Sequence, residues 1–224
     1  SSDLLAKSGL TMNQALGAAP GTLRLAAAAS IDAATAAEAQ GNIINSFQLK
    51  AEDANHVADA LANVANAAAG EVPDFMQGLQ QAATVAHGFG ISMDDTVATL
   101  GLFANAGIKG SDAGTSLKTM LTHLAAPSDQ AGKAMDALGL NIRNAKGEFV
   151  GMRELFRQIG EASSRMRPDD FQENVATVFG TDAIRGAMIA GSQGIETLDR
   201  MKKSVIEVGG ATKMAAANMQ GVPG

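Results

Sequence analysis

Glycine interrupts this chain at short intervals, and the interruptions limit the length of any helix that it can form. Apolar runs end at glycines throughout the 224 residues, and glycine is the residue most typical of helix C-termini. A continuous helix of this length would extend about 340 Å at 1.5 Å per residue. The stops exclude such a rod and predict helices of about 10 to 18 residues that fold back on one another. The predicted stops are Gly70, Gly88, Gly90, Gly107, Gly110, Gly139, Gly160, Gly180, Gly191, Gly209 and Gly210.

Between the stops, apolar residues recur at the helical spacing i, i+3, i+4, i+7. Two such sets are Leu61, Val64, Ala65 and Ala68, and Leu117, Met120, Leu121 and Leu124. Start signals agree with this spacing. They are a capping box at Thr11 and Gln14, N-caps at Ser92, Ser111 and Ser128, and prolines in first turns at Pro73 and Pro168. The predicted fold is therefore all-α, a compact multi-helix bundle of short helices.

One segment departs from the helical pattern. In "LNIRNAKGEFVGM", residues 140–152, apolar and polar residues alternate around "NAKG". Ala145 and Lys146 suit a type I turn with Gly147 at positive φ. The pattern predicts one small two-stranded β-hairpin near residues 140–151, which must pack on helices because it cannot stand alone.

The chain divides into three stretches that we expect to form one contiguous domain. Residues 1–50 form an Ala-rich helical segment, residues 51–127 helical hairpins, and residues 128–224 the β-hairpin plus helices. "SGLTMNQALGAA" from Ser8 also aligns with "FGISMDDTVATL" from Phe89, pairing Gly9 with Gly90 and Met12 with Met93 at an offset of 81. Two alternatives stay open: residues 1–50 and 90–127 are duplicated hairpins, or two Ala-rich helices converge on similar caps.

Composition narrows the function classes. Apolar residues make up 46% of the chain but aromatics only 4%, so the core is built from small side chains that each bury little area. We expect modest stability, or stability gained from neighbouring subunits. The net charge of -6 argues against direct nucleic-acid binding, because phosphate binders concentrate Lys and Arg. The start at Ser1 and the end in "GVPG" suggest a fragment of a longer chain.

No pattern of reactive residues predicts catalytic, cofactor-binding or metal-binding residues. "GIKGSDAGTSLK", residues 107–118, resembles a phosphate loop but fits neither register of that motif and follows a helix. Gly114 is instead expected to be a notch that lets another helix approach. The three histidines, His56, His87 and His123, show no zinc spacing. The acid pairs Asp94 with Asp95 and Asp169 with Asp170 suit helix first turns.

Three ordered blocks resemble the core region of the tail tape measure proteins of long-tailed bacteriophages. They are "NAGIKGSDAGTSLKTML" at 105–121, "ALGLNIRNAKGEFVGMREL" at 137–155 and "VFGTDAIRGAMIA" at 178–190. With the helical stretch before them, the resemblance covers residues 52–210, whereas the first 50 residues resemble the family only in texture.

The resemblance implies a structural virion protein inside the tail tube or tail tip, present in the host cytoplasm during assembly. In that family the protein sets tail length, nucleates tail tube assembly and supports DNA ejection. Its implied partners are the tail tube protein, tail tip or distal tail proteins and tail assembly chaperones, and we expect a homo-oligomer. It implies no enzyme activity and no cofactor. The alternative is a generic helical protein-interaction or scaffold module that is not connected with phage tails.

Overall fold

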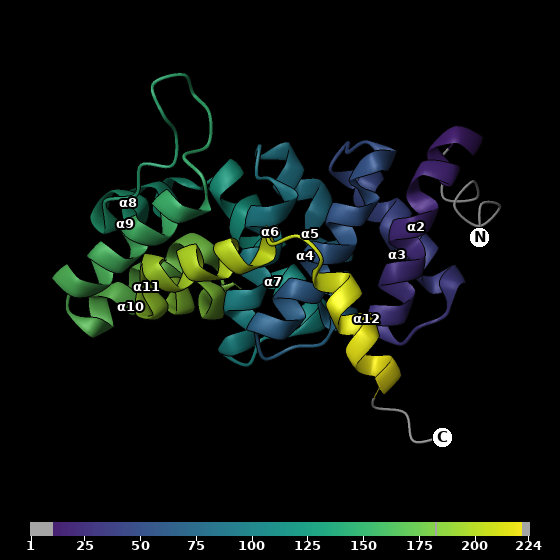
Figure 1. The fold of residues 1–224 in the computed structure, drawn as a ribbon. Coiled ribbons are helices and arrows are strands. Elements are labelled where there is room, and N and C mark those ends of the chain that lie inside the picture. The colour runs from purple at the N-terminus through teal and green to yellow at the C-terminus, as the bar shows by residue number, and fades with distance from the viewer. Residues whose placement is uncertain (1–10, 182, 221–224) are drawn as a thin grey trace.

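The computed structural model describes residues 11–181 and 183–220, which contain eleven α-helices and one 3-10 turn (Figure 1). The all-α prediction is confirmed. In chain order the elements are α2 (Met12–Ala29), α3 (Ala33–Ser46), η1 (Ala51–Asp53), α4 (Ala54–Ala67), α5 (Val72–Gly88), α6 (Met93–Asn105), α7 (Gly110–Ala125), α8 (Asp129–Leu138), α9 (Met152–Arg165), α10 (Pro168–Phe179), α11 (Ile184–Val205) and α12 (Gly210–Gln220).

Most predicted helix starts are confirmed. Thr11 and Gln14 form the capping box of α2, and Ser92 and Ser128 accept backbone N–H groups as N-caps of α6 and α8. The N-cap predicted at Ser111 is wrong, because α7 begins one residue earlier, at Gly110. These starts depend on groups within three residues of one another, which is why sequence patterns find them.

Four predicted stops are wrong: Gly110 and Gly210 begin α7 and α12, and Gly160 and Gly191 lie inside α9 and α11. A Cβ built on Gly160 would lie 4.0 Å from the carbonyl oxygen of Gly191. The two glycines therefore mark the place where α9 and α11 approach each other. Helix α11 changes direction at a different glycine, Gly194, whose φ is +71°.

The predicted notch at Gly114 is confirmed. A Cβ on Gly114, in α7, would lie 2.1 Å from the carbonyl oxygen of Gly78, in α5. Gly21 plays a similar part between α2 and α4, since a Cβ there would lie 2.6 Å from the carbonyl carbon and oxygen of Ala54. At these crossings the two helix backbones touch directly, so the helices pack closely although the chain has few bulky side chains.

Helix α6 lies at the centre of the bundle. Every residue from Thr96 to Ala104 is buried, and α4, α5, α7 and α11 all pack against this helix. Figure 1 shows α8, α9 and α10 gathered at one end, α2 and α3 at the other, and α12 packed across α2 and α4. A single apolar core runs from Ala15 to Ala211. The chain thus folds back on itself, and the longest helix, α11, has only 22 residues.

The predicted two-stranded β-hairpin near residues 140–151 is wrong. Its turn forms as expected, with Gly147 at φ +78° and the Gly147 N–H bonded to the Asn144 carbonyl at 2.9 Å. Within the described residues, however, this segment contains a single antiparallel bridge, Arg143 to Phe149, and no strand.

Two backbone hydrogen bonds flank the bridge, from the Asn144 N–H to the Glu148 carbonyl at 2.8 Å and from the Val150 N–H to the Ile142 carbonyl at 3.0 Å. Side chains bond other backbone groups of the loop. The buried Gln158 of α9 accepts the Asn141 N–H at 2.8 Å and donates to the Asn141 carbonyl at 3.1 Å. The Asn144 carboxamide oxygen accepts the N–H groups of Lys146 and Glu148. A loop pinned in this way has little to gain from a short ribbon that is marginal by itself.

Candidate functional site

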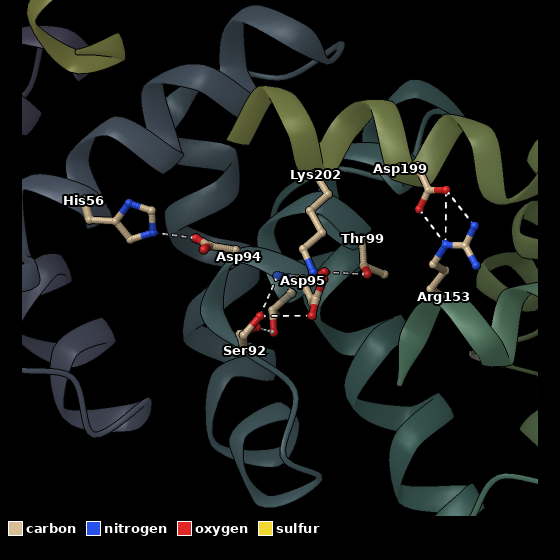
Figure 2. Close-up of polar contacts among 9 residues, drawn as sticks. His56, Ser92, Asp94, Asp95, Thr99, Arg153, Asp199 and Lys202 are labelled. Carbon is tan, nitrogen blue, oxygen red and sulfur yellow. Dashed lines mark hydrogen bonds and ion pairs between the residues drawn. The ribbon is translucent and has the colours of Figure 1, made fainter. Parts of the chain in front are cut away.

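Charged side chains gather at the start of α6, where α4 and α11 meet it (Figure 2). His56 of α4 lies 2.7 Å from Asp94, and Lys202 of α11 lies 2.6 Å from Asp95. The acids occupy the first turn of α6, where they complement the positive end of the helix dipole. Lys202 is half-exposed and ties α11 to α6 through this contact.

A third ion pair joins α9 to α11 near this cluster (Figure 2). The Arg153 guanidinium makes a bidentate contact with Asp199, with Nε–Oδ1 at 2.8 Å and Nη2–Oδ2 at 2.9 Å. Both side chains are exposed, so water screens the pair and we expect it to add little stability. The pair fixes orientation more than it adds stability.

The arrangement of these residues does not form a nucleophile triad. The Ser92 hydroxyl lies 3.1 Å from the Asp95 carboxylate and accepts the Asp95 N–H, so its contacts are those of a helix cap. His56 faces Asp94. The two contacts are separate, whereas general-base catalysis needs the nucleophile and the imidazole within hydrogen-bond reach of each other.

The other histidines and acids singled out in the sequence lie apart from this cluster. His87 packs edge-on against Phe47, and His123 places Nδ1 3.2 Å from the Val178 carbonyl. Asp169 and Asp170 occupy the first turn of α10. Among residues 11–181 and 183–220, no group of three His, Cys, Asp or Glu side chains is placed to hold a metal ion.

The hydrogen bond that His56 donates to Asp94 raises the pKa of His56 above its usual value of 6.5, and the charges of Asp53 and Asp59 act in the same direction. The ion pair stabilises the fold fully below about pH 6.5, provided that Asp94 is ionised, and is lost as pH rises through the higher pKa of the folded state. Because His56 is 40% exposed, we expect a loss of only about 1–3 °C in Tm between about pH 6.5 and 8.

His56→Gln tests this prediction, since it removes the titrating group while keeping a polar side chain. The part of the pH dependence due to the pair should be absent in this variant. An NMR titration of the wild-type imidazole supplies a direct reading. A pKa for His56 at or below 6.5 would contradict the prediction.

A buried polar pair on α4 holds the junction between α11 and α12. Asp59 and Asn63 are only 6% and 8% exposed. The Asp59 carboxylate accepts the N–H groups of Gly209 at 2.9 Å and Ala211 at 3.0 Å, at the start of α12. Asn63 donates to the carbonyls of Val205 and Glu207 at the end of α11. One helix thus caps two others that lie about 150 residues away in the chain.

Sequence reasoning missed this pair. The available signal was a polar pair at i and i+4 in the otherwise apolar run "VADALANVA", which puts both polar side chains on one face. The sequence could not show what they bind, because their partners are backbone groups of a distant turn.

Two of the grooves lined by the described residues lie between pairs of helices. One, of about 450 Å³, lies between α3 and α5 and includes Ile31, Ile43, Met76 and Leu79 in its lining. The other, of about 520 Å³, lies between α9 and α11 around Gly191 and Gly194. Neither groove contains a cluster of titratable groups placed for metal binding. Within the described residues, no helix is both long enough and apolar enough to cross a membrane.

Comparison with known proteins identifies relatives. A family model described as phage-related minor tail protein matches residues 2–180. The tape measure protein of Pneumococcus phage Dp-1 is 34% identical over 216 residues, which is 96% of this chain and 19% of that protein. The probable tape measure protein of Escherichia phage P2 is 29% identical over 190 residues, 83% of this chain and 23% of that protein. The chain spans about a fifth of the length of these relatives. No solved structure matches it.

Proposed function

Because this chain belongs to the phage-related minor tail protein family and is related to phage tape measure proteins, we propose that it is a folded segment of a tape measure protein. The match to the family model over most of the chain carries this proposal. The segment acts by binding other tail proteins, and its role is structural rather than catalytic. Its place is the virion tail, inside the tube or tip, with the host cytoplasm as its site of assembly.

The short helices favour one of two roles for this segment. It can be an assembly station, meaning a folded domain whose docking starts tail assembly, or a ruler, meaning a stretch whose length sets the tail length; the short helices favour the station. A ruler measures length through a fixed rise per residue, which requires a continuous helix. Here the longest helix has 22 residues and bends at Gly194, so it spans about 33 Å at most. We therefore propose that the described residues act as one domain that docks to tube or tail tip proteins. Through that docking it nucleates tube assembly and contributes indirectly to tail length and DNA ejection.

Self-association and binding to tail assembly chaperones belong to the same proposal. The chain presents exposed apolar side chains on α2, α11 and α12, among them Leu16, Met188 and Met219. Such side chains suit contacts with other proteins. The net charge of -6 suits a protein that shares a tube with DNA without gripping the phosphates.

In-frame deletion of residues 52–210 in the phage that encodes this chain tests the proposal. Electron microscopy of the lysate measures tail number and tail length. A station predicts few or no tails, because assembly fails to start. A ruler would instead give normal numbers of tails that are shorter by about 240 Å, the length of 159 helical residues.

Tails of normal number and length would contradict both forms of the proposal. They would favour the alternative, a helical scaffold module that is not connected with tail assembly. Full-length protein expressed from a plasmid is the control, since it should restore tails if the deletion acts through loss of this segment.

A further inference from the structure

Helix α2 carries a row of exposed apolar side chains on its outer face. Met12, Leu16 and Leu23 are 57%, 58% and 54% exposed, and the half-buried Ala19 lies between them. The spacing of 4, 3 and 4 residues puts all four on one face and is the spacing of a helix-pairing seam. We call these four residues the α2 stripe. The opposite face of α2 packs on the bundle through Ala15, Ala18, Thr22 and Leu25.

The corresponding row on α6 shows that a helix can pack on such a stripe. At the offset of 81 seen in the sequence, the α2 stripe aligns with Met93, Val97, Leu100 and Ala104, all of them buried. Helix α5 covers this row: Leu100 Cδ1 would lie 3.1 Å from a Cβ on Gly78 of α5, and Ala104 borders the same contact. The α6–α7 hairpin thus receives a helix on the face that α2 leaves exposed.

The burial pattern of the two hairpins agrees beyond this row. Buried positions of α3 correspond, at an offset of 80, to buried positions of α7. The pairs are Ala36 with Ser116, Ala37 with Leu117, Gln40 with Met120, Gly41 with Leu121 and Ile44 with Leu124. The proposed pairing of Gly9 with Gly90 lies outside the described residues. This similar burial supports treating α2 and α6 as equivalent helices. On this face α6 is covered by another helix, whereas α2 is exposed.

The absence of charge along this part of α2 indicates what kind of surface can pack on the α2 stripe. From Met12 to Leu23, α2 carries no charged side chain, and Arg24 is the first. An uncharged apolar row is best matched by another uncharged row, since burying an unpaired charge against it costs free energy. The α2 stripe of a second copy is such a row, and it is exposed in the same way.

The stripe is also complementary to itself. In an antiparallel pair, Leu16 of one copy lies opposite Ala19 of the other, and Met12 lies opposite Leu23. Leu16, the large side chain near the centre, then meets the small Ala19, which lets the helices approach closely. A two-fold axis between the copies satisfies this arrangement, because the same patch serves on both sides.

We propose that the α2 stripe pairs with the α2 stripe of a second copy as an antiparallel helix contact. This proposal deepens the self-association part of the proposed function and rests on it. Four side chains per copy are far fewer than the roughly 20–30 residues per side of a stable interface. The pair is therefore weak in dilute solution, with a Kd on the order of 100 µM. It strengthens where copies are held together, as in an assembly.

Sedimentation equilibrium between about 5 and 500 µM, bracketing the expected Kd, tests the pairing. The wild-type mass should rise toward that of a dimer across this range. Leu16→Glu should stay monomeric throughout, a loss of at least about tenfold in association. Val208→Glu is the matched control, because Val208 is 86% exposed between α11 and α12, and it should associate like the wild type. Far-UV circular dichroism verifies that helix content is the same in all three proteins.

Cysteine cross-linking tests the antiparallel geometry, since the chain contains no cysteine of its own. Leu16→Cys and Ala19→Cys proteins are mixed and oxidised. Mixed disulfide dimers should exceed either homodimer, because residues 16 and 19 lie opposite each other. Predominant homodimers would indicate a parallel pair and overturn the geometry.

A monomeric wild type at 500 µM, or a Leu16→Glu protein that associates normally, would overturn the pairing itself. Such a result would indicate that another protein covers the α2 stripe. The proposed tail function is judged separately by the deletion phage, so loss of tails together with a monomeric protein would overturn the stripe pairing alone.

Discussion

Gly114→Ala is expected to lower the free energy of unfolding by about 2–4 kcal/mol, a fall in Tm of roughly 5–15 °C. The added Cβ would lie 2.1 Å from the carbonyl oxygen and 2.8 Å from the carbonyl carbon of Gly78. Both are backbone atoms, so no side-chain rotation can relieve the contact. Helices α5 and α7 would have to separate, which weakens the packing around the buried Leu79 and Leu117.

Gly132→Ala is the matched control for this substitution. Gly132 lies inside α8 with nothing within 4 Å of the position of a Cβ, and alanine favours the helix over glycine by up to about 1 kcal/mol. This variant should therefore be as stable as the wild type or slightly more stable. Urea unfolding followed by circular dichroism measures both variants. Equal stability of the two variants would show that α5 and α7 do not approach as closely as the structure indicates.

Asp59→Ala is expected to cost about 2–4 kcal/mol and to free α12 from the bundle. The substitution removes the acceptor of two N–H groups, those of Gly209 and Ala211, and the second of these is buried. Apolar packing alone holds α12 weakly, because its buried residues are only Gly210, Ala211 and Ala215. Loss of the cap should therefore be felt mainly in α12.

Hydrogen exchange resolved by segment measures this effect. Amides of residues 210–220 should lose protection in Asp59→Ala, while those of the central helix α6 should keep it. Asp59→Asn retains one acceptor oxygen, so its loss of stability should be intermediate. Asp136→Ala, at an exposed aspartate of α8, is the control and should change stability by no more than about 0.5 kcal/mol. Unchanged protection of α12 in Asp59→Ala would contradict the proposed cap.

Gly114→Ala also tests the tail function. If the segment docks as a folded unit, a phage that carries Gly114→Ala should lose tails in proportion to the unfolded fraction. The same phage grown at a lower temperature should recover tails, since stability near the growth temperature decides that fraction.

Local interactions made much of the helical fold predictable. Thr11, Ser92 and Ser128 cap helices through groups three residues away, and Gly147 closes its turn with Asn144. Such contacts form wherever the sequence pattern occurs, because they need no other part of the chain. The same reasoning explains why glycine spacing excluded a rod.

Long-range contacts decided the rest. Gln158 of α9 binds the backbone groups of Asn141 and so pins that loop to the bundle, and Gly160 and Gly191 serve a helix crossing where stops were expected. Asp59 became a cap only because folding brings Gly209 to it across 150 residues. A sequence pattern reports each residue's preferences among its near neighbours. Which distant backbone group a buried polar side chain meets, and which glycine faces another helix, depends on how the helices pack.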